Sequence, residues 1–497
     1  MPFDIFSNPE LKRNAWIELR QNRIWALLGL MAFAYVFANT AFVNQYNPAT
    51  EVLMNTSVTI FYFLVGVWGT KNAADAVAEE INQKTWDRQR MSGQNPWTLT
   101  IGKLFGPTLY QWLGGFVAMT IYFVAALNSD KSATLVVGGL IHIGLGLLTN
   151  MLALLLSLLN ITGNAQSSFS HSKINTTFFY VVSIVVAAWL FGILMSLGFE
   201  SGAITWFGIV WNQVTILISL LVFVAWSLIG IHQNLRTELQ YRNKAGYWIA
   251  FLVFVAIYFF GFMINDGEWN EVLRKTIYHA PKLSLATRSY YHLLFIAALF
   301  FGITQFLLLV ERKAEEEYKS FLTLLRKGQW KRLWIEAPLW FSSGIAFVLS
   351  VKILLLIYIL GIDETPDFTR SLLHVYPRFY NVDTTDLTAR IDVSKLAVVL
   401  CFTSTILLLL RDVFFTRYLL YKSKFKNKLL VIALYYVIIY WAIPGLFMVG
   451  KESSNANEIA VFLPYYASAA WTSFIAIGIQ AIAAWWWHRH AVLKEAE

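Results

Sequence analysis

The charged side chains of this sequence gather in short stretches between long apolar runs, and the richest stretch covers residues 75–106. It reads DAVAEEINQKTWDRQRMSGQNPWTLTIGKLFG and mixes carboxylates, basic groups and tryptophan. Gly93 interrupts the stretch, Asn95 has a side chain typical of a helix N-cap, and Pro96 suits the first helical position. The pattern therefore predicts a helix, a turn and a second helix at the membrane face between two apolar runs.

A second charged stretch, residues 311–335, has the pattern of an amphipathic helix. Tyr318, Phe321, Leu322 and Leu325 follow the spacing i, i+3, i+4 and i+7, and Gly328 follows the basic end of the helix. Such a helix either lies on lipid headgroups or offers a docking surface to a cytoplasmic partner. The residues alone leave both interpretations open for both stretches.

Four polar side chains within apolar runs are candidates for a transport path, namely Asn39, His142, His292 and Lys352. Ionisable groups inside a membrane are costly and are often functional. The alternative is structural, because histidine and asparagine also bond neighbouring helices and a lysine can extend its amine to the interface. The structural interpretation is favoured for each of them.

No metal centre or disulfide is expected. The single cysteine, Cys401, lies in an apolar run and has no partner for an intrachain disulfide. Residues 363–393 carry His374, Asp383, Asp386 and Asp392, but their spacing matches no ligand pattern. We expect a solvated outer segment there.

The chain has 497 residues, of which 57% are hydrophobic and only 14% charged, with a mean hydropathy of +0.54. This composition excludes an ordinary soluble enzyme and predicts an all-α polytopic membrane protein, because lipid cannot satisfy unpaired backbone groups. About twelve apolar runs are candidate transmembrane helices. They lie near residues 24–43, 53–70, 104–127, 133–161, 177–199, 205–231, 245–265, 289–310, 337–362, 396–410, 429–449 and 461–487.

The basic residues predict the orientation of these helices. Most of the 39 Lys and Arg residues fall in segments on the same side as the N-terminus. The positive-inside rule then places both termini in the cytoplasm, so the net charge of +9 reflects topology and no nucleic-acid partner is expected. The second half repeats the layout of the first, which predicts two parallel six-helix units, residues 1–235 and 236–497.

The first charged stretch resembles the coupling segment of ABC-2 type transporter permeases. The resemblance covers residues 75–103 and rests on Glu79, Glu80, Lys84, Thr85, Trp86, Asp87, Arg90, Ser92, Pro96, Gly102 and Lys103. It implies a cytoplasmic elbow helix, for which residues 8–23 are the match, and six spans per unit. It also implies short re-entrant helices on the outside, near residues 198–207 and 444–464. The second half keeps this order of elements but lacks the Thr-Trp-Asp string.

The resemblance implies a permease subunit of an ATP-driven ABC-2 exporter in a bacterial inner membrane, with the two halves forming a pseudo-dimer. The chain contains no Walker A loop, so ATP and magnesium would bind a separate cytoplasmic ATPase in two copies, and this chain would hold no catalytic residue or cofactor. The coupling residues, and Tyr318, Phe321, Leu322 and Leu325 in the second stretch, would contact that ATPase. Sparse charge along the spans favours an apolar or amphipathic cargo, and membrane lipids are the other expected partner.

Three other functions fit the composition. A twelve-span secondary transporter shares the layout, but Glu311 and Asp266 lie at span ends, which leaves ion coupling without an embedded carboxylate. A lipid-linked glycosyltransferase needs paired acids on an early outer loop, where only Glu51 occurs. A scaffold without transport activity has the same composition. The exporter is the leading hypothesis, and the secondary transporter is the main alternative.

Overall fold

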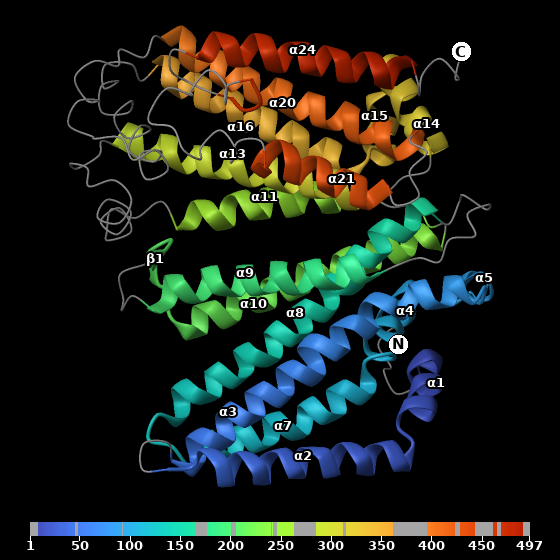
Figure 1. The fold of residues 1–497 in the computed structure, drawn as a ribbon, viewed down its shortest axis with the longest axis vertical. Helices are drawn as coiled ribbons and strands as arrows, with labels where there is room; N and C mark the ends of the chain where they lie inside the picture. Colours follow the sequence, from blue (N-terminus) through green and yellow to red (C-terminus); the bar gives the residue numbers. More distant parts are fainter. Residues whose placement is uncertain are drawn as a thin grey trace. The chain divides into compact units, whose positions relative to one another are not determined.

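The structure, a computed structural model, describes the helical part of the chain. The described residues are 8–44, 48–91, 93–164, 176–199, 205–239, 241, 246–262, 285–311, 315–360, 395–422, 428–442, 461–464 and 469–490. Figure 1 shows long helices throughout, and the strands β1 (Thr205–Trp206) and β2 (Ile209–Val210) form one small ladder.

The chain divides into two compact units. Unit 1 comprises Met1–Thr205 and Ile209–Lys244, and unit 2 comprises Trp206–Gly208 and Ala245–Glu497. The helices of unit 1 are α1 (Pro9–Glu18), α2 (Gln21–Phe42), α3 (Ala49–Phe61), the π-helix η2 (Tyr62–Gly69), α4 (Thr70–Asn82), α5 (Trp86–Arg90), α6 (Pro96–Phe105), α7 (Leu109–Leu127), α8 (Ser132–Asn164), α9 (Thr177–Phe199) and α10 (Gln213–Glu238). Those of unit 2 are α11 (Gly246–Gly261), α13 (Leu285–Val310), α14 (Glu315–Arg326), α15 (Trp330–Glu336), α16 (Leu339–Leu360), α20 (Lys395–Lys422), α21 (Lys428–Val437), the π-helix η5 (Ile438–Ala442) and α24 (Ala470–His488). The parallel six-helix layout of both halves stays a prediction.

Eight helical stretches among the described residues are long and apolar enough to cross a membrane. They are Gln21–Phe42, Ala49–Asn82, Leu109–Leu127, Ser132–Asn160, Gln213–Glu238, Leu293–Val310, Leu339–Leu356 and Leu396–Leu420. Shorter apolar helices cover Thr177–Ala188, Gly246–Gly261 and Val431–Tyr440, and α24 falls in the last predicted span. The all-α integral membrane class is confirmed. The count of twelve spans and the cytoplasmic termini stay predictions.

The apolar run predicted as a span from residue 205 begins as a hairpin instead. β1 and β2 turn at Phe207 and Gly208, both of which have positive φ. α10 starts only at Gln213, because the Asn212 side chain accepts two backbone N–H groups and forms a capping box there. Of the expected re-entrant segments, residues 205–207 are not helical, and most of 444–464 lies outside the described residues.

The span predicted at residues 396–410 is too short. α20 continues without a break to Lys422 and passes through Arg411, Asp412 and Arg417, all three buried inside unit 2. The sequence interpretation ended the span at the first charge. The helix continues because Arg411 and Asp412 find polar partners on neighbouring helices.

Close packing of unit 1 depends on small residues in its apolar helices. A Cβ added to Gly115 of α7 would lie 2.5 Å from a Val65 methyl group, and one added to Gly146 of α8 would lie 2.9 Å from the Phe61 ring. Helices without a Cβ at the contact approach closely, as is common between membrane helices. α7 and α8 therefore pack directly on α3 and η2.

Candidate functional site

A buried cluster of charged side chains joins α1, α4 and α6 of unit 1. The Lys103 ammonium donates to Glu10 Oε1 at 2.9 Å and also to Glu80 Oε2. The side chains of Lys103, Glu10 and Glu80 are only 1%, 5% and 11% exposed. We call these three residues, together with Arg13 and Gln89, the charge cluster.

Arg13 and Gln89 complete the hydrogen bonding of the two carboxylates. Arg13 Nη2 donates to Glu10 Oε1 at 2.8 Å and to Glu80 Oε1 at 3.0 Å. Gln89 Nε2 donates to Glu80 Oε1 at 2.9 Å, which brings the residues around α5 into the network. Two carboxylates thus face an ammonium and a guanidinium group, and the cluster has no net charge. A buried charge without such partners would cost several kcal/mol.

Local sequence explains how α1 and α6 come close enough to share this cluster. Asn8 caps α1 and Asn95 caps α6, and a proline follows each cap as the first helical residue. A Cβ added to Gly102 would lie 2.6 Å from Glu10 Cβ, so only glycine allows the Glu10 side chain to pass and reach Lys103. The Gly-Lys pair of the predicted coupling segment therefore has a packing reason.

The predicted coupling residues separate into buried and exposed groups. Trp86 is buried, with the Lys103 ammonium 5.7 Å from its ring centroid, and Arg90 Nε donates to the Glu238 carbonyl of α10 at 3.0 Å. Thr85 donates to the Glu80 carbonyl, and Pro96 begins α6. Three of the predicted residues remain exposed, and together with the neighbouring Arg88, which was not predicted, we call them the α4–α5 face: Glu79, Lys84, Asp87 and Arg88. A partner can reach this face, whereas Glu80, Trp86 and Lys103 position it from inside. Glu10 was missed, because nothing in a sequence pairs it with a lysine 93 residues away.

The predicted docking stripe on α14 faces its own unit. Tyr318 and Phe321 are buried, Leu322 is half-buried and Leu325 is exposed. The Tyr318 hydroxyl is 3.2 Å from His488 Nε2 of α24, and Phe321 packs against the ring of Trp340 of α16. Tyr318 and Phe321 therefore pack inside unit 2, and their contact with an ATPase stays a prediction. An apolar stripe at helical spacing here marks the core of unit 2.

The four residues predicted to line a transport path lie in different environments. His142 Nδ1 lies 2.6 Å from the Tyr62 hydroxyl of the π-helix η2, so this histidine bonds two spans together. Asn39 of α2 and Lys352 of α16 are exposed on their helices. His292 lies in α13, and its side chain is outside the described part of the chain. π-helical turns often mark functional positions, which makes Tyr62 and His142 the pair of interest.

A second polar network, absent from the sequence analysis, is buried in unit 2 around Asp412 of α20. Arg411 Nε and Nη2 each donate to Asp412 Oδ1 at 3.0 Å, and the Tyr435 hydroxyl donates to the same oxygen at 2.6 Å. Gln305 Nε2 donates to Oδ2 at 2.8 Å, and Tyr440 donates there as well. Five hydrogen bonds from α13, α20, α21 and η5 thus satisfy one carboxylate.

The network also reaches α24 and corrects an expectation from sequence. Arg411 Nη1 donates to Gln480 Oε1 at 2.8 Å. Unit 2 therefore holds a carboxylate and a guanidinium inside a candidate membrane span, where the sequence analysis found none away from span ends. The signal was the Arg-Asp pair itself, which interrupts an apolar pattern that resumes directly after it.

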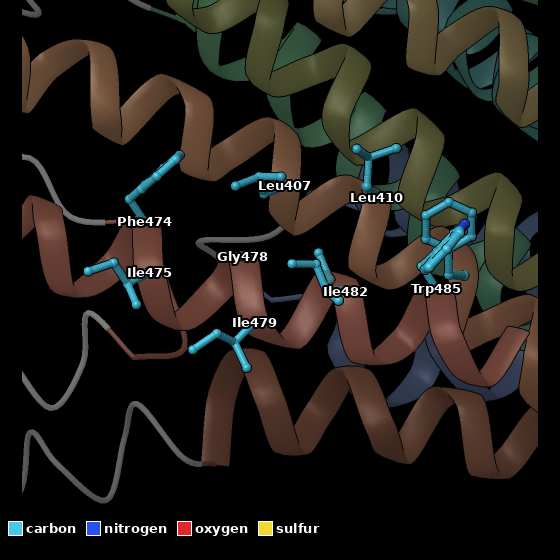
Figure 2. A pocket seen from close by; sticks show the side chains of 10 residues that line it. Leu407, Leu410, Phe474, Ile475, Gly478, Ile479, Ile482 and Trp485 are labelled. Atoms are coloured by element: carbon cyan, nitrogen blue, oxygen red, sulfur yellow. The ribbon is translucent and has the colours of Figure 1, made fainter. Parts of the chain in front are cut away.

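An apolar groove runs between α20 and α24. Its volume is about 440 Å³. Figure 2 shows Leu407 and Leu410 on α20 and Ile479, Ile482 and Trp485 on the neighbouring α24, all of which line it. The lining offers almost no polar group, so the groove suits acyl chains or another helix more than a polar ligand.

The described residues contain no group of three or more His, Cys, Asp or Glu side chains able to hold a metal ion, and residues 363–393 lie outside them. No family model matches the chain, and neither a curated protein nor a solved structure matches it.

Proposed function

We propose that the chain is the membrane subunit of an ATP-driven exporter of the ABC-2 type, powered by a separate cytoplasmic ATPase. The observation that carries the proposal is the charge cluster, which ties the predicted elbow helix α1 to α4 and α6 of the predicted coupling segment. A coupling element must move as one body if it is to transmit force. Buried ion pairs with complete hydrogen bonding supply that stiffness.

The exposed part of the segment is where the ATPase would bind. The Asp87 side chain is 79% exposed and its carboxylate is 3.7 Å from Arg90, so the α4–α5 face carries both signs of charge beside a rigid support. A push on this face passes through Lys103 to α6, which leads through a short turn at Gly106 and Pro107 into the span α7. ATP and magnesium belong to the partner. The cargo is apolar or amphipathic and leaves through an opening between helices.

Substitution of Asp87 tests this proposal. We expect Asp87→Arg to abolish copurification of an ATPase from native membranes, because it reverses the charge of an exposed contact residue without entering the core. The matched control is Asp130→Arg, which is equally a surface aspartate but follows the far end of α7. Trp86→Ala is a poor test, since Trp86 is buried and its loss damages folding. Normal copurification of the ATPase with Asp87→Arg would contradict the proposal.

Asp412 favours one second candidate, an ion-coupled secondary transporter. Carriers of this kind use carboxylates inside the membrane, and Asp412 is fully buried within the candidate span Leu396–Leu420. In the carrier interpretation the chain alone, reconstituted in liposomes with an internal pH dye, moves protons in response to a pH gradient. Asp412→Asn would abolish that movement and Asp130→Asn would preserve it. An exporter subunit gives no proton movement with either variant.

A further inference from the structure

The corner between α14 and α15 of unit 2 carries concentrated positive charge. Arg326, Lys327, Lys331 and Arg332 are all exposed, and none forms an ion pair within the described part of the chain. Trp330 sits among them and is 58% exposed. No carboxylate occurs between residues 318 and 335. We call residues 325–332 the basic corner.

Contacts of α15 set the depth of the basic corner. The Trp334 ring lies 6.2 Å from the ring of Phe341, in the first turn of α16, and Leu333 is fully buried in unit 2. α15 therefore folds back beside the start of a candidate membrane span and does not extend away from it. Only Ala337 and Pro338 separate α15 from α16. The basic corner therefore lies next to one end of a candidate membrane span, where lipid headgroups are expected.

Tryptophans on neighbouring helices mark the same level. Trp248 at the start of α11 donates to the Leu339 carbonyl at 3.1 Å, next to the first turn of α16. At the end of α24, Trp485 is exposed and Arg489 lies 5.3 Å from its ring centroid. The bond between Tyr318 and His488 brings this end of α24 beside α14, as Figure 1 also shows. Aromatic and basic side chains at one depth are typical of a membrane interface.

We propose that the basic corner binds the headgroups of anionic phospholipids in the membrane that the chain spans. Four cations without a counter-ion among the described residues match a negatively charged leaflet, and Trp330 supplies an amphipathic ring at the boundary. The α4–α5 face differs, because acids and bases alternate there. The proposal rests on the transmembrane character of the chain and is independent of the exporter. It gives the second charged stretch the role of a lipid anchor.

The binding experiment uses the purified full chain and phosphatidylglycerol as the probe. Native mass spectrometry of the detergent-solubilised protein measures the apparent affinity for this lipid relative to phosphatidylcholine. Removal of each charge is expected to weaken binding roughly fivefold, so Lys327→Gln with Lys331→Gln weakens it about 25-fold. Lys327→Arg with Lys331→Arg keeps the charge and is expected to keep the affinity. Lys327 and Lys331 are both exposed, so neither double substitution disturbs the fold.

A depth measurement separates lipid binding from protein docking. Gln329→Cys in a Cys401→Ser background gives a single labelling site in the basic corner, because the chain has one cysteine. We expect a fluorophore there to be quenched by headgroup nitroxides in nanodiscs that contain phosphatidylglycerol, and less in phosphatidylcholine alone or at high salt. Equal affinity of the Gln and Arg double variants would overturn the proposal. Quenching of equal strength with and without phosphatidylglycerol would also overturn it. The same holds if only a copurified ATPase protects the label.

Discussion

Replacing Lys103 with methionine removes the central cation of the charge cluster while keeping a side chain of similar length. Glu10 and Glu80 are then buried together, with Arg13 as their remaining cation. Breaking a buried ion pair by removing one partner costs about 3–5 kcal/mol. Since Arg13 still bonds both carboxylates, although its side chain is 50% exposed, we expect the lower end, about 3 kcal/mol.

Limited proteolysis measures this loss where it occurs. Lys84 and Arg88 are exposed trypsin sites in and beside α5, and cleavage there requires local opening of the segment. When opening is fast, the cleavage rate follows the population of the open form. A loss of about 3 kcal/mol raises that population, and with it the rate, by roughly a hundredfold. The experiment is carried out on the full chain in mild detergent.

Two further variants make the test specific to the charge cluster. Lys71→Met makes the same substitution at an exposed position of α4 and is expected to change stability by less than about 0.5 kcal/mol. Adding Glu80→Gln to Lys103→Met makes the cluster neutral again, and we expect part of the loss to be recovered. The reasoning is refuted if Lys103→Met and Lys71→Met are cleaved at the same rate.

Three smaller predictions follow from other contacts, each measured by thermal unfolding in detergent. Gly115→Ala should lower stability by about 1–3 kcal/mol through overpacking. In the control Gly29→Ala the added methyl group meets no atom within 4 Å, so this variant should be neutral or stabilising. Equal effects of the two substitutions would contradict the role of Gly115 in packing. Tyr62→Phe removes the hydrogen bond to His142 and should lower stability by only about 0.6 kcal/mol, the average for a hydrogen bond between membrane helices. A loss of stability several times larger would mean that the Tyr62 hydroxyl does more than bond His142. Arg417→Met should leave stability unchanged or raise it, because Nε and Nη2 of this buried guanidinium have no hydrogen-bond partner among the described residues. Strong destabilisation would reveal a missing counter-ion or a large contribution from the Tyr318 and Trp340 rings that the guanidinium faces.

Local signals predicted the part of the fold that depends on neighbouring residues. Apolar runs indicated where helices occur, and the Asn95–Pro96 pair predicted the start of α6, as the structure confirms. The later start of α10 was missed because the cap at Asn212 lies inside an apolar run. Propensity and capping act over a few residues, so a sequence carries them directly.

Long-range pairing accounts for what the sequence did not predict. Glu10 and Lys103 meet only because α1 folds onto α6, and Gln305 meets Asp412 across 107 residues. From sequence alone, a charged residue after an apolar run indicates the end of a span, because its partners are not visible. For this reason α20 was predicted too short. The stripe of Tyr318 and Phe321 had the spacing of a docking surface, but spacing does not say which partner covers it.

The central claim, that a separate ATPase drives this chain, is tested most directly by isolating the unmodified chain from native membranes in mild detergent. Mass spectrometry then identifies the polypeptides that come with it and their ratio. We expect a soluble polypeptide with a Walker A loop, in two copies for each chain. Recovery of the folded chain without any such polypeptide would contradict the exporter account and favour a carrier that uses Asp412.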